Sequence, residues 1–174
     1  MGVSGSGKST VAEALAPRLG WVLGEADDFH PPENVARMEQ GIALTSEDRW
    51  PWLHALAEWI GAHDAAGTST VLACSALRRS YRDVLRSGVR SDPVAGAADG
   101  VGFVHLVGPT EVLASRMSGR EGHFMPAELL RSQLETLEPL ESDEVGVVLD
   151  IRSSPEELVE AVIAWLHTGD ASTR

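Results

Sequence analysis

The sequence predicts an α/β protein built on a parallel β-sheet, and three observations support this class. A glycine-rich segment at residues 2–9 leads directly into an amphipathic run, the local pattern of a phosphate-binding loop followed by a helix. Short apolar segments then recur at residues 21–23, 70–74, 102–107 and 145–150. Stretches with helical spacing of apolar residues separate them, and this alternation is typical of parallel sheets whose helices connect successive strands.

The first segment fits the P-loop, with Gly2, four further residues, and then Gly7-Lys8-Ser9. In such a loop the backbone N–H groups surround a phosphate, the lysine reaches the β- and γ-phosphates, and the serine hydroxyl binds Mg²⁺. A helix that starts at Lys8 would point its positive end at the same anion. We therefore expect a nucleotide site formed by Gly5, Ser6, Gly7, Lys8, Ser9 and Thr10, with Ser9 as the metal ligand. A flexible glycine-serine leader, the alternative, needs neither the lysine nor the amphipathic run.

A P-loop normally follows the central strand of a parallel sheet, whereas here Met1 alone precedes Gly2. Loss of a buried central strand would expose the edges of its two neighbours. We therefore expect residues upstream of the given sequence, with Met1 at the end of that first strand.

Composition limits the remaining possibilities. A chain of 174 residues suits one domain over residues 1–174. The net charge of −12 and the pI near 4.8 argue against general nucleic-acid binding, which needs basic surfaces. The single cysteine, Cys74, excludes an intramolecular disulfide and agrees with a reducing compartment. Without a membrane-spanning stretch or a signal-peptide pattern, the sequence indicates a cytoplasmic protein with no nucleic-acid or membrane partner.

An acidic segment follows the predicted strand at residues 21–23. Glu25, Asp27 and Asp28 precede His30, and they lie where the carboxyl end of a strand presents ligand-binding groups in open α/β sheets. A solvated turn whose aspartate caps the next helix, at residues 32–40, is the alternative.

Residues 41–52 are predicted to be a loop that enters the next helix. That helix is indicated by the apolar spacing of Leu53, Leu56, Ala57 and Ile60. Trp52 is expected in the core. The fork of Arg49 suits a ligand anion, although a surface ion pair with Asp48 or Glu47 fits the sequence equally well.

The strand at residues 70–74 ends without the aspartate of a Walker B motif. The Mg²⁺ shell would then be completed by water or by the acidic groups near Asp27, and whether Glu25 or Asp28 takes part is open. Cys74 is expected to be a buried apolar side chain. A locally basic surface, or else a solvated helix face, is predicted from Arg78, Arg79, Arg82 and Arg86.

The second half of the chain predicts a mobile loop, a lid and three more helices. Residues 87–100 lack periodicity and are expected to form the loop. A helix begins at Thr110, and Arg116 and Arg120 flank Gly119, so both could close onto phosphates as a lid. A helix end with two surface arginines is the alternative.

The last helices have clear boundaries. Residues 126–137 form one helix, which Pro139 stops. The final helix starts at Pro155, with Ser154 and Glu157 as a capping box, and a frayed tail from residue 169.

Several motifs in this order resemble the gluconate kinase (gluconokinase) family of P-loop small-molecule kinases. The resemblance extends from Gly2 to about Pro139. Its blocks are residues 2–10, residues 27–31 with Asn34, Gly41 with Leu44 and residues 48–53, residues 74–78 with Tyr81 and Arg82, and residues 122–126 with Gln133 and residues 136–138.

The resemblance implies phosphorylation of D-gluconate by ATP, with Mg²⁺, at the 6-hydroxyl. It also implies the three-layer fold of nucleoside-monophosphate kinases, with a doubly wound, parallel, five-stranded sheet. Other expected features are a lid around residues 117–127, a substrate-binding helical region around residues 30–66, and a homodimer. A kinase for shikimate or a nucleotide is the nearest alternative, and a nucleotide-dependent switch module is a further one.

The family roles map onto individual residues. Lys8, Mg²⁺ and Arg120 would neutralise the transferred phosphoryl group, and Asp27 would accept the proton of the attacking hydroxyl. The gluconate would be held by Arg49, Arg78, His30 and His123. Arg116 would lie over the adenine, with the turn that ends at Pro155 on its other side.

Overall fold

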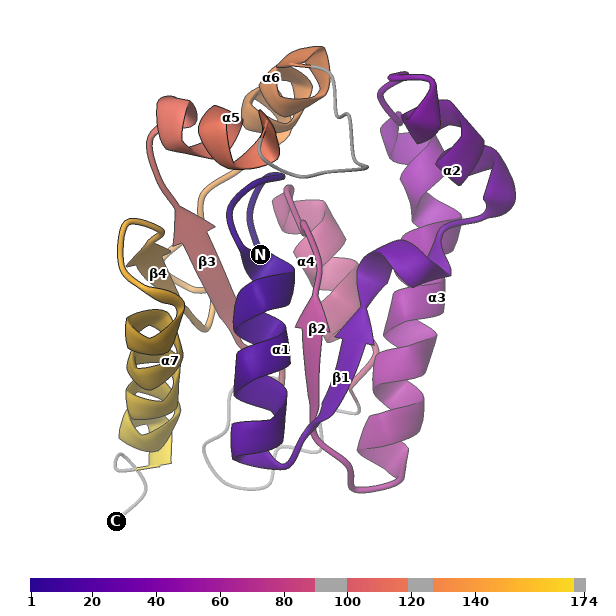
Figure 1. Ribbon diagram of the computed structural model, residues 1–174. Helices are drawn as coiled ribbons and strands as arrows, with labels where there is room; N and C mark the ends of the chain where they lie inside the picture. The colour runs from indigo at the N-terminus through magenta and orange to yellow at the C-terminus, as the bar shows by residue number, and fades with distance from the viewer. Residues whose placement is uncertain (90–99, 119–126, 171–174) are drawn as a thin grey trace.

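A computed structural model describes residues 1–89, 100–118 and 127–170, and its elements follow the predicted order (Figure 1). In chain order they are α1 (Lys8–Leu19), β1 (Val22–Glu25), the 3-10 helix η1 (Ala26–Phe29), α2 (Pro32–Glu39), α3 (Ser46–Ala65), β2 (Thr70–Ala73), α4 (Arg79–Arg86), β3 (Phe103–Val107), α5 (Thr110–Ser118), α6 (Ala127–Thr136), β4 (Gly146–Asp150) and α7 (Pro155–Asp170). The predicted α/β class is confirmed.

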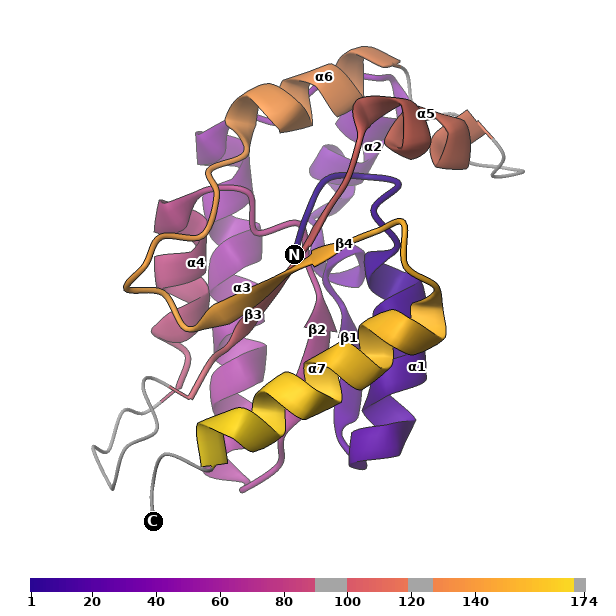
Figure 2. The same ribbon diagram turned by 90° about the vertical axis from the view of Figure 1, so that its left-hand side faces the viewer.

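All strand pairs in the described part of the chain are parallel. β1 pairs with β2, with Val22 opposite Thr70, and β3 pairs with β4, with Phe103 opposite Gly146. Helices α1 and α7 cover one face of these strands, and α3 and α4 cover the other (Figure 2). The molecule therefore has the three layers expected for this class.

Among the described residues the strands form two sheets of two strands, where the sequence predicts one sheet of five. Met1 lies between β2 and β3. Its amino group donates to the carbonyl of Val104, its carbonyl accepts from the N–H of Leu106 at 3.0 Å, and the N–H of Gly2 donates to Ser75 at 3.1 Å. Met1 thus occupies the position expected for the end of the first strand.

The core has two parts, one on each face. The first part joins α1 to α7 and contains Val11 and Val159. The second joins α3 to α4, and in it Leu53 and Leu56 are fully buried. Trp52 and Cys74 are buried in this second part, as the sequence predicts.

Helix α3 begins earlier than predicted, because Ser46 and the following residues are helical instead of forming a loop. The Oγ1 of Thr45 accepts from the N–H of Asp48 at 3.2 Å, and the Asp48 carboxylate accepts from the Thr45 N–H at 2.7 Å. This reciprocal capping box stabilises a helix start at Ser46, before Pro51, which lies inside the helix.

The predicted basic surface on α4 is wrong. Arg82 is fully buried and forms two hydrogen bonds to Glu144, at 2.7 and 2.6 Å, so the pKa of Glu144 is lowered to about 2. Arg86 also bonds to Glu144, and Arg79 bonds to Asp143 at 2.8 Å. Carboxylates distant in sequence therefore neutralise three of the four arginines.

Other predictions at the chain's second half have mixed outcomes. The capping box of α7 is confirmed, since the Ser154 N–H donates to Glu157 at 2.8 Å and the Glu157 N–H donates to Ser154 at 3.2 Å. Most of the predicted loop at residues 87–100, most of the lid around residues 117–127 and the end of the tail fall outside the described residues.

No described helix is both long and apolar enough to cross a membrane.

Candidate active site

The candidate site lies at the carboxyl ends of the strands, where the loop before α1, η1 and the start of α4 come together (Figure 1). Helices α5 and α6 lie on one side of this end of the molecule, and α2 lies on the other. Ligands bind at this edge in open parallel sheets because loops from several strands meet there.

The P-loop owes its shape to glycines. Gly5 and Gly7 adopt positive φ angles of 79° and 88°, and a Cβ on Gly5 would lie 2.7 Å from the carbonyl oxygen of Leu113. Gly7 is the N-cap of α1 and has no capping side chain. Because the first N–H groups of a helix have no partners within it, this end of α1 can bind an anion.

Glu25 at the end of β1 contacts the P-loop serine. Its carboxylate lies near the Ser9 side chain. Burial raises the pKa of Glu25, and the nearby carboxylates of Asp27 and Asp28 raise it further, whereas the contacts with Ser9 and Lys8 oppose the shift. The Nζ of Lys8 lies 3.1 Å from the carbonyl oxygen of Val3.

This arrangement fits a magnesium ion shared with nucleotide phosphates. Among the described residues, no group of three or more His, Cys, Asp or Glu side chains could hold a metal alone. Mg²⁺ commonly keeps waters and takes one or two protein oxygens besides phosphate. The Ser9 hydroxyl and the Glu25 carboxylate offer such oxygens side by side, and a cation there would relieve the crowding of carboxylates.

Arg116 lies beside the P-loop, at a second part of the site. Its Nη2 donates to the carbonyl of Ile151 at 2.8 Å, and its Nη1 is 3.9 Å from where a Cβ on Gly7 would be. A cavity of about 240 Å³ separates the P-loop from the turn before α7, and Pro155 lines it together with Arg116. The structure thus brings together these two predicted nucleotide-binding residues.

Arg49 and Arg78 converge on one aromatic ring. The Cζ atom of each lies 5.9 Å from the centroid of Tyr81. The Nη1 of Arg78 donates to the Ser46 hydroxyl at 3.2 Å, and that hydroxyl lies 2.8 Å from the hydroxyl of Tyr81. Two guanidinium groups on one ring form a local positive site in an acidic protein, and such a fork suits a carboxylate.

The alternative pairing of Arg49 with Asp48 is not found among the described hydrogen bonds and ion pairs. The Asp48 carboxylate instead bonds to the Thr45 N–H and hydroxyl and to Arg37. These contacts lower the pKa of Asp48, with the Thr45 backbone hydrogen bond as the largest cause. Asp48 therefore fixes the start of α3 and leaves Arg49 directed to Tyr81.

His30 is held in place by stacking. Its ring lies 4.4 Å from that of Trp52, at an interplanar angle of 12°. The indole N–H of Trp52 donates to Ala26 at 2.7 Å, which ties α3 to the helix η1 that carries Asp27. Burial lowers the pKa of His30, and its Nδ1 is buried without a hydrogen-bond partner in the described part of the chain.

Asp27 is within electrostatic reach of both halves of the site. The negative charge of Asp27 contributes to raising the pKa of Glu25, which lies near Ser9, and it opposes the lowering of the pKa of His30, which stacks on Trp52. Its side chain is exposed on η1. Asp27 can therefore face a ligand that bridges the P-loop and the arginines.

Three contributing residues have no role in the sequence analysis. Ser46 and Tyr81 orient Arg78, and Gln133 of α6 accepts from the N–H of Ser4 in the P-loop at 2.7 Å. Each contact joins residues distant in sequence, so spacing alone could not find it. The predicted residues Arg120 and His123 lie outside the described residues.

The chain is similar to known proteins over most of its length. A family model described as an AAA domain matches residues 1–140. A gluconokinase of Gluconobacter oxydans is 45% identical over 98% of this chain and 90% of its own length. The crystal structure of a gluconokinase from Sinorhizobium meliloti is 45% identical, covers 97% of this chain and 89% of that one, and has a TM-score of 0.83. The unliganded structure of a sugar kinase from Janibacter sp. is 58% identical, covers 96% and 91%, and has a TM-score of 0.86.

Proposed function

This chain belongs to the gluconokinase family of P-loop kinases, and we propose from that membership that it transfers the γ-phosphoryl group of ATP to the 6-hydroxyl of D-gluconate. It is an enzyme, and its products are 6-phospho-D-gluconate and ADP. The observation that carries the proposal is the pair of arginines, Arg49 and Arg78, on the ring of Tyr81. The carboxylate of gluconate supplies the planar anion that such a pair binds.

The acceptor binds between the two arginines and the P-loop. Arg49 and Arg78 hold its carboxylate, and the neutral imidazole of His30 hydrogen-bonds to a hydroxyl of the polyol. Support comes from the buried, unpartnered Nδ1 of His30, because a buried polar atom is costly unless a ligand or water satisfies it. His123 is assigned to the same polyol by family resemblance alone.

Asp27 accepts the proton during transfer. The oxygen of the 6-hydroxyl forms a bond to the γ-phosphorus, the bond from that phosphorus to the β-γ bridging oxygen breaks, and the hydroxyl proton moves to the Asp27 carboxylate. Because the transition state is loose, the protein chiefly positions the hydroxyl and neutralises charge. Lys8 and Arg120 supply positive charge from the protein.

The nucleotide binds along the P-loop. The N–H groups at the start of α1 surround the phosphates, with Gly5, Ser6, Gly7 and Thr10 in the loop and first turn. Arg116 and Pro155 enclose the adenine, which the cavity of about 240 Å³ between them supports. Ser9 and Glu25 would hold Mg²⁺, which would partly neutralise the negative charge of the phosphate oxygens.

The test is release of ADP from MgATP in a coupled assay. The acceptors are gluconate, shikimate, a mixture of nucleoside monophosphates, and none. Stimulation by gluconate alone is expected. Stimulation by shikimate or a nucleotide, but not by gluconate, would overturn the substrate assignment.

Family resemblance also supports a homodimer. Sedimentation velocity of the purified chain measures the mass directly, and a monomer over the working concentration range would contradict this part of the proposal.

A further inference from the structure

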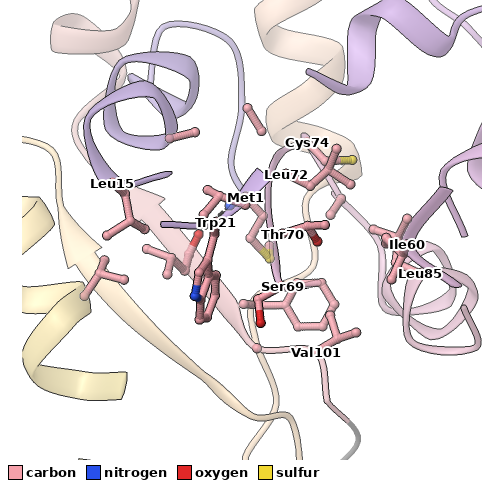
Figure 3. A pocket seen from close by; sticks show the side chains of 18 of the residues that line it. Met1, Leu15, Trp21, Ile60, Ser69, Thr70, Leu72, Cys74, Leu85 and Val101 are labelled. Carbon is pink, nitrogen blue, oxygen red and sulfur yellow. Dashed lines mark hydrogen bonds between the residues drawn. The ribbon is translucent and has the colours of Figure 1, made fainter. Parts of the chain in front are cut away.

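The segment between β2 and α4 carries Arg78 and contains a strained residue. Thr70, Leu72 and Cys74 follow one another along β2 and just past its end (Figure 3). Ala76 then adopts a φ of 44°, alone among the non-glycine residues that the structure describes, and it is buried. A residue with a Cβ stays in the left-handed region only where surrounding contacts fix the backbone. The position of Arg78 therefore depends on the contacts that hold this segment.

Glu138, which follows α6, bonds to the backbone on both sides of Arg78. Its N–H donates to the carbonyl of Leu77 at 2.7 Å, and its carboxylate accepts from the N–H of Arg79 at 2.6 Å. Figure 2 shows the chain that leaves α6 running past α4. Because peptide groups are planar, fixing the two that flank Arg78 restricts both of its backbone dihedral angles. A residue distant in sequence thus sets the direction in which the Arg78 side chain leaves the backbone.

The same contact supplies the cap that α4 lacks. Arg78 is the N-cap residue, with an extended backbone and no capping hydrogen bond from its side chain. A guanidinium group has no acceptor and cannot fill that role. The Glu138 carboxylate instead accepts from the first N–H of the helix and places a negative charge at the positive end of its dipole. The Arg78 side chain is left to bond to Ser46.

Arg82 reinforces this arrangement from the protein interior. Its Nη1 donates to the carbonyl of Ala76 at 3.3 Å and to the carbonyl of Glu138 at 3.0 Å. Arg82 is itself fully buried and held by Glu144. The strained residue and Glu138 are therefore joined to one fixed group, so the backbone of Glu138 is a firm base for its carboxylate.

We propose that Glu138 is a positioning residue for acceptor binding, which fixes the two peptide groups around Arg78 and so directs its guanidinium group to the acceptor carboxylate. The proposal rests on the proposed function for the identity of the acceptor. Glu138 acts through Arg78, so its loss should weaken the binding of gluconate and leave the binding of ATP unchanged.

Three substitutions of Glu138 separate its reach from its charge. Glu138→Ala removes the acceptor, and Glu138→Asp keeps the charge on a side chain one carbon shorter. Glu138→Gln keeps an acceptor oxygen at the same distance from the backbone without the charge. The matched control is Glu141→Ala, which removes a neighbouring carboxylate that bonds to the side chain of Arg79 at 3.2 Å and not to its N–H.

The first readout is the Michaelis constant for each substrate. Glu138→Ala and Glu138→Asp should raise KM for gluconate roughly fivefold and leave KM for ATP unchanged, whereas Glu138→Gln and Glu141→Ala should alter neither. In the Arg78→Lys background, Glu138→Ala should add less than about a twofold change, because both residues act through one guanidinium group. Equal rises of both KM values, or effects that multiply in the double variant, would overturn the proposal.

The second readout needs no acceptor. Tyr81 is the single tyrosine of the chain, and the Cζ of Arg78 lies 5.9 Å from its ring centroid. The NMR signals of ring-¹³C tyrosine therefore report on Arg78 alone among variants that keep the fold. Glu138→Ala and Glu138→Asp should move these signals toward their positions in Arg78→Lys, and Glu138→Gln should not.

Unmoved Tyr81 signals in a folded Glu138→Asp variant would overturn the proposal whatever the acceptor is. Failure of the proposed function is seen separately, as the absence of stimulation by gluconate in the unaltered chain.

Discussion

The phosphate end and the acceptor end of the site are built in different ways. The phosphate end consists mainly of backbone from the consecutive residues 2–10, shaped by glycines at positive φ. The proposed acceptor end consists of side chains from separate elements, with Arg49 on α3 and Arg78 at the start of α4. A contiguous backbone site is set by local sequence, whereas a dispersed site depends on the packing that brings its parts together.

The difference has a chemical reason. Every nucleoside triphosphate presents the same phosphates, and a fixed ring of N–H groups suits them all. An acceptor must be told apart from other polyols, which requires placed charges and hydrogen-bonding groups. Substitutions at the acceptor end should therefore reduce specificity for the acceptor, and substitutions at the phosphate end should reduce the rate of transfer.

The largest effect is expected at the phosphate end, from Lys8→Ala. Loss of the positive charge that neutralises the phosphoryl group should lower kcat by roughly 10³-fold or more. A coupled assay measures the rate, and circular dichroism checks that the fold is retained. Activity near that of the unaltered chain would remove the P-loop from the catalytic account.

The next effect joins the two ends, because Asp27 is proposed to accept the proton of the acceptor hydroxyl as that hydroxyl attacks the phosphate. Asp27→Asn should reduce kcat by roughly a hundredfold through loss of the proton acceptor. Asp28→Asn removes the same charge from the neighbouring exposed position and is the matched control. If both variants lose equal activity, the effect is one of net charge and Asp27 is not the base.

A smaller effect sharpens the acceptor end. Arg78→Lys keeps the charge but loses the planar fork, so KM for gluconate should rise about tenfold while KM for ATP stays constant. Arg79→Lys is the control, since Arg79 bonds to Asp143 and not to Ser46. Equal changes of both KM values in Arg78→Lys would show that the two ends are not separable.

Replacement of Gln133 tests whether the P-loop keeps its shape without a side-chain hydrogen bond. Gln133→Leu removes the acceptor for the Ser4 N–H, at a cost of about 1 kcal/mol, and should raise KM for ATP roughly fivefold. Glu135→Gln, on the exposed face of the same helix, should leave KM unchanged. An unaltered KM for ATP in Gln133→Leu would show that the loop keeps its shape unaided.

The smallest effect is a pH dependence at Glu25. Its raised pKa means that the carboxylate is protonated at a higher pH than an ordinary glutamate, so Mg²⁺ binding with ATP should weaken on acidification earlier than expected for such a group. Calorimetric Mg²⁺ titrations between pH 7.5 and roughly 5.5 measure this slope. Glu25→Gln should remove it, and a retained slope would exclude Glu25 from the metal site.

The sequence predicts those parts of the molecule that are formed by contacts between residues close together in the chain. The P-loop, the strands β1 to β4 and the capping box of α7 follow from spacing and short-range chemistry. The early start of α3 also has a local signal, the capping pair of Thr45 and Asp48.

Non-local contacts could not be predicted in this way. Arg78, Arg79 and Arg82 look alike in sequence, yet one faces Ser46, one faces Asp143, and one is buried on Glu144, 62 residues away. The acceptor site needs the same kind of information. Local chemistry offered Arg49, Asp27 and His30 as candidates, and the family resemblance added their roles. The orienting roles of Ser46 and Tyr81 follow only from the packing.

The most direct test of whether the acceptor end binds a carboxylate compares gluconate with glucitol, which has a hydroxymethyl group in place of the carboxylate. Both offer a primary hydroxyl at the far end of the same chain. If Arg49 and Arg78 bind the carboxylate, kcat/KM should be at least roughly a hundredfold higher for gluconate. That factor corresponds to about 3 kcal/mol, the contribution of hydrogen bonds to a charged group. Equal kcat/KM for the two acceptors would contradict the account.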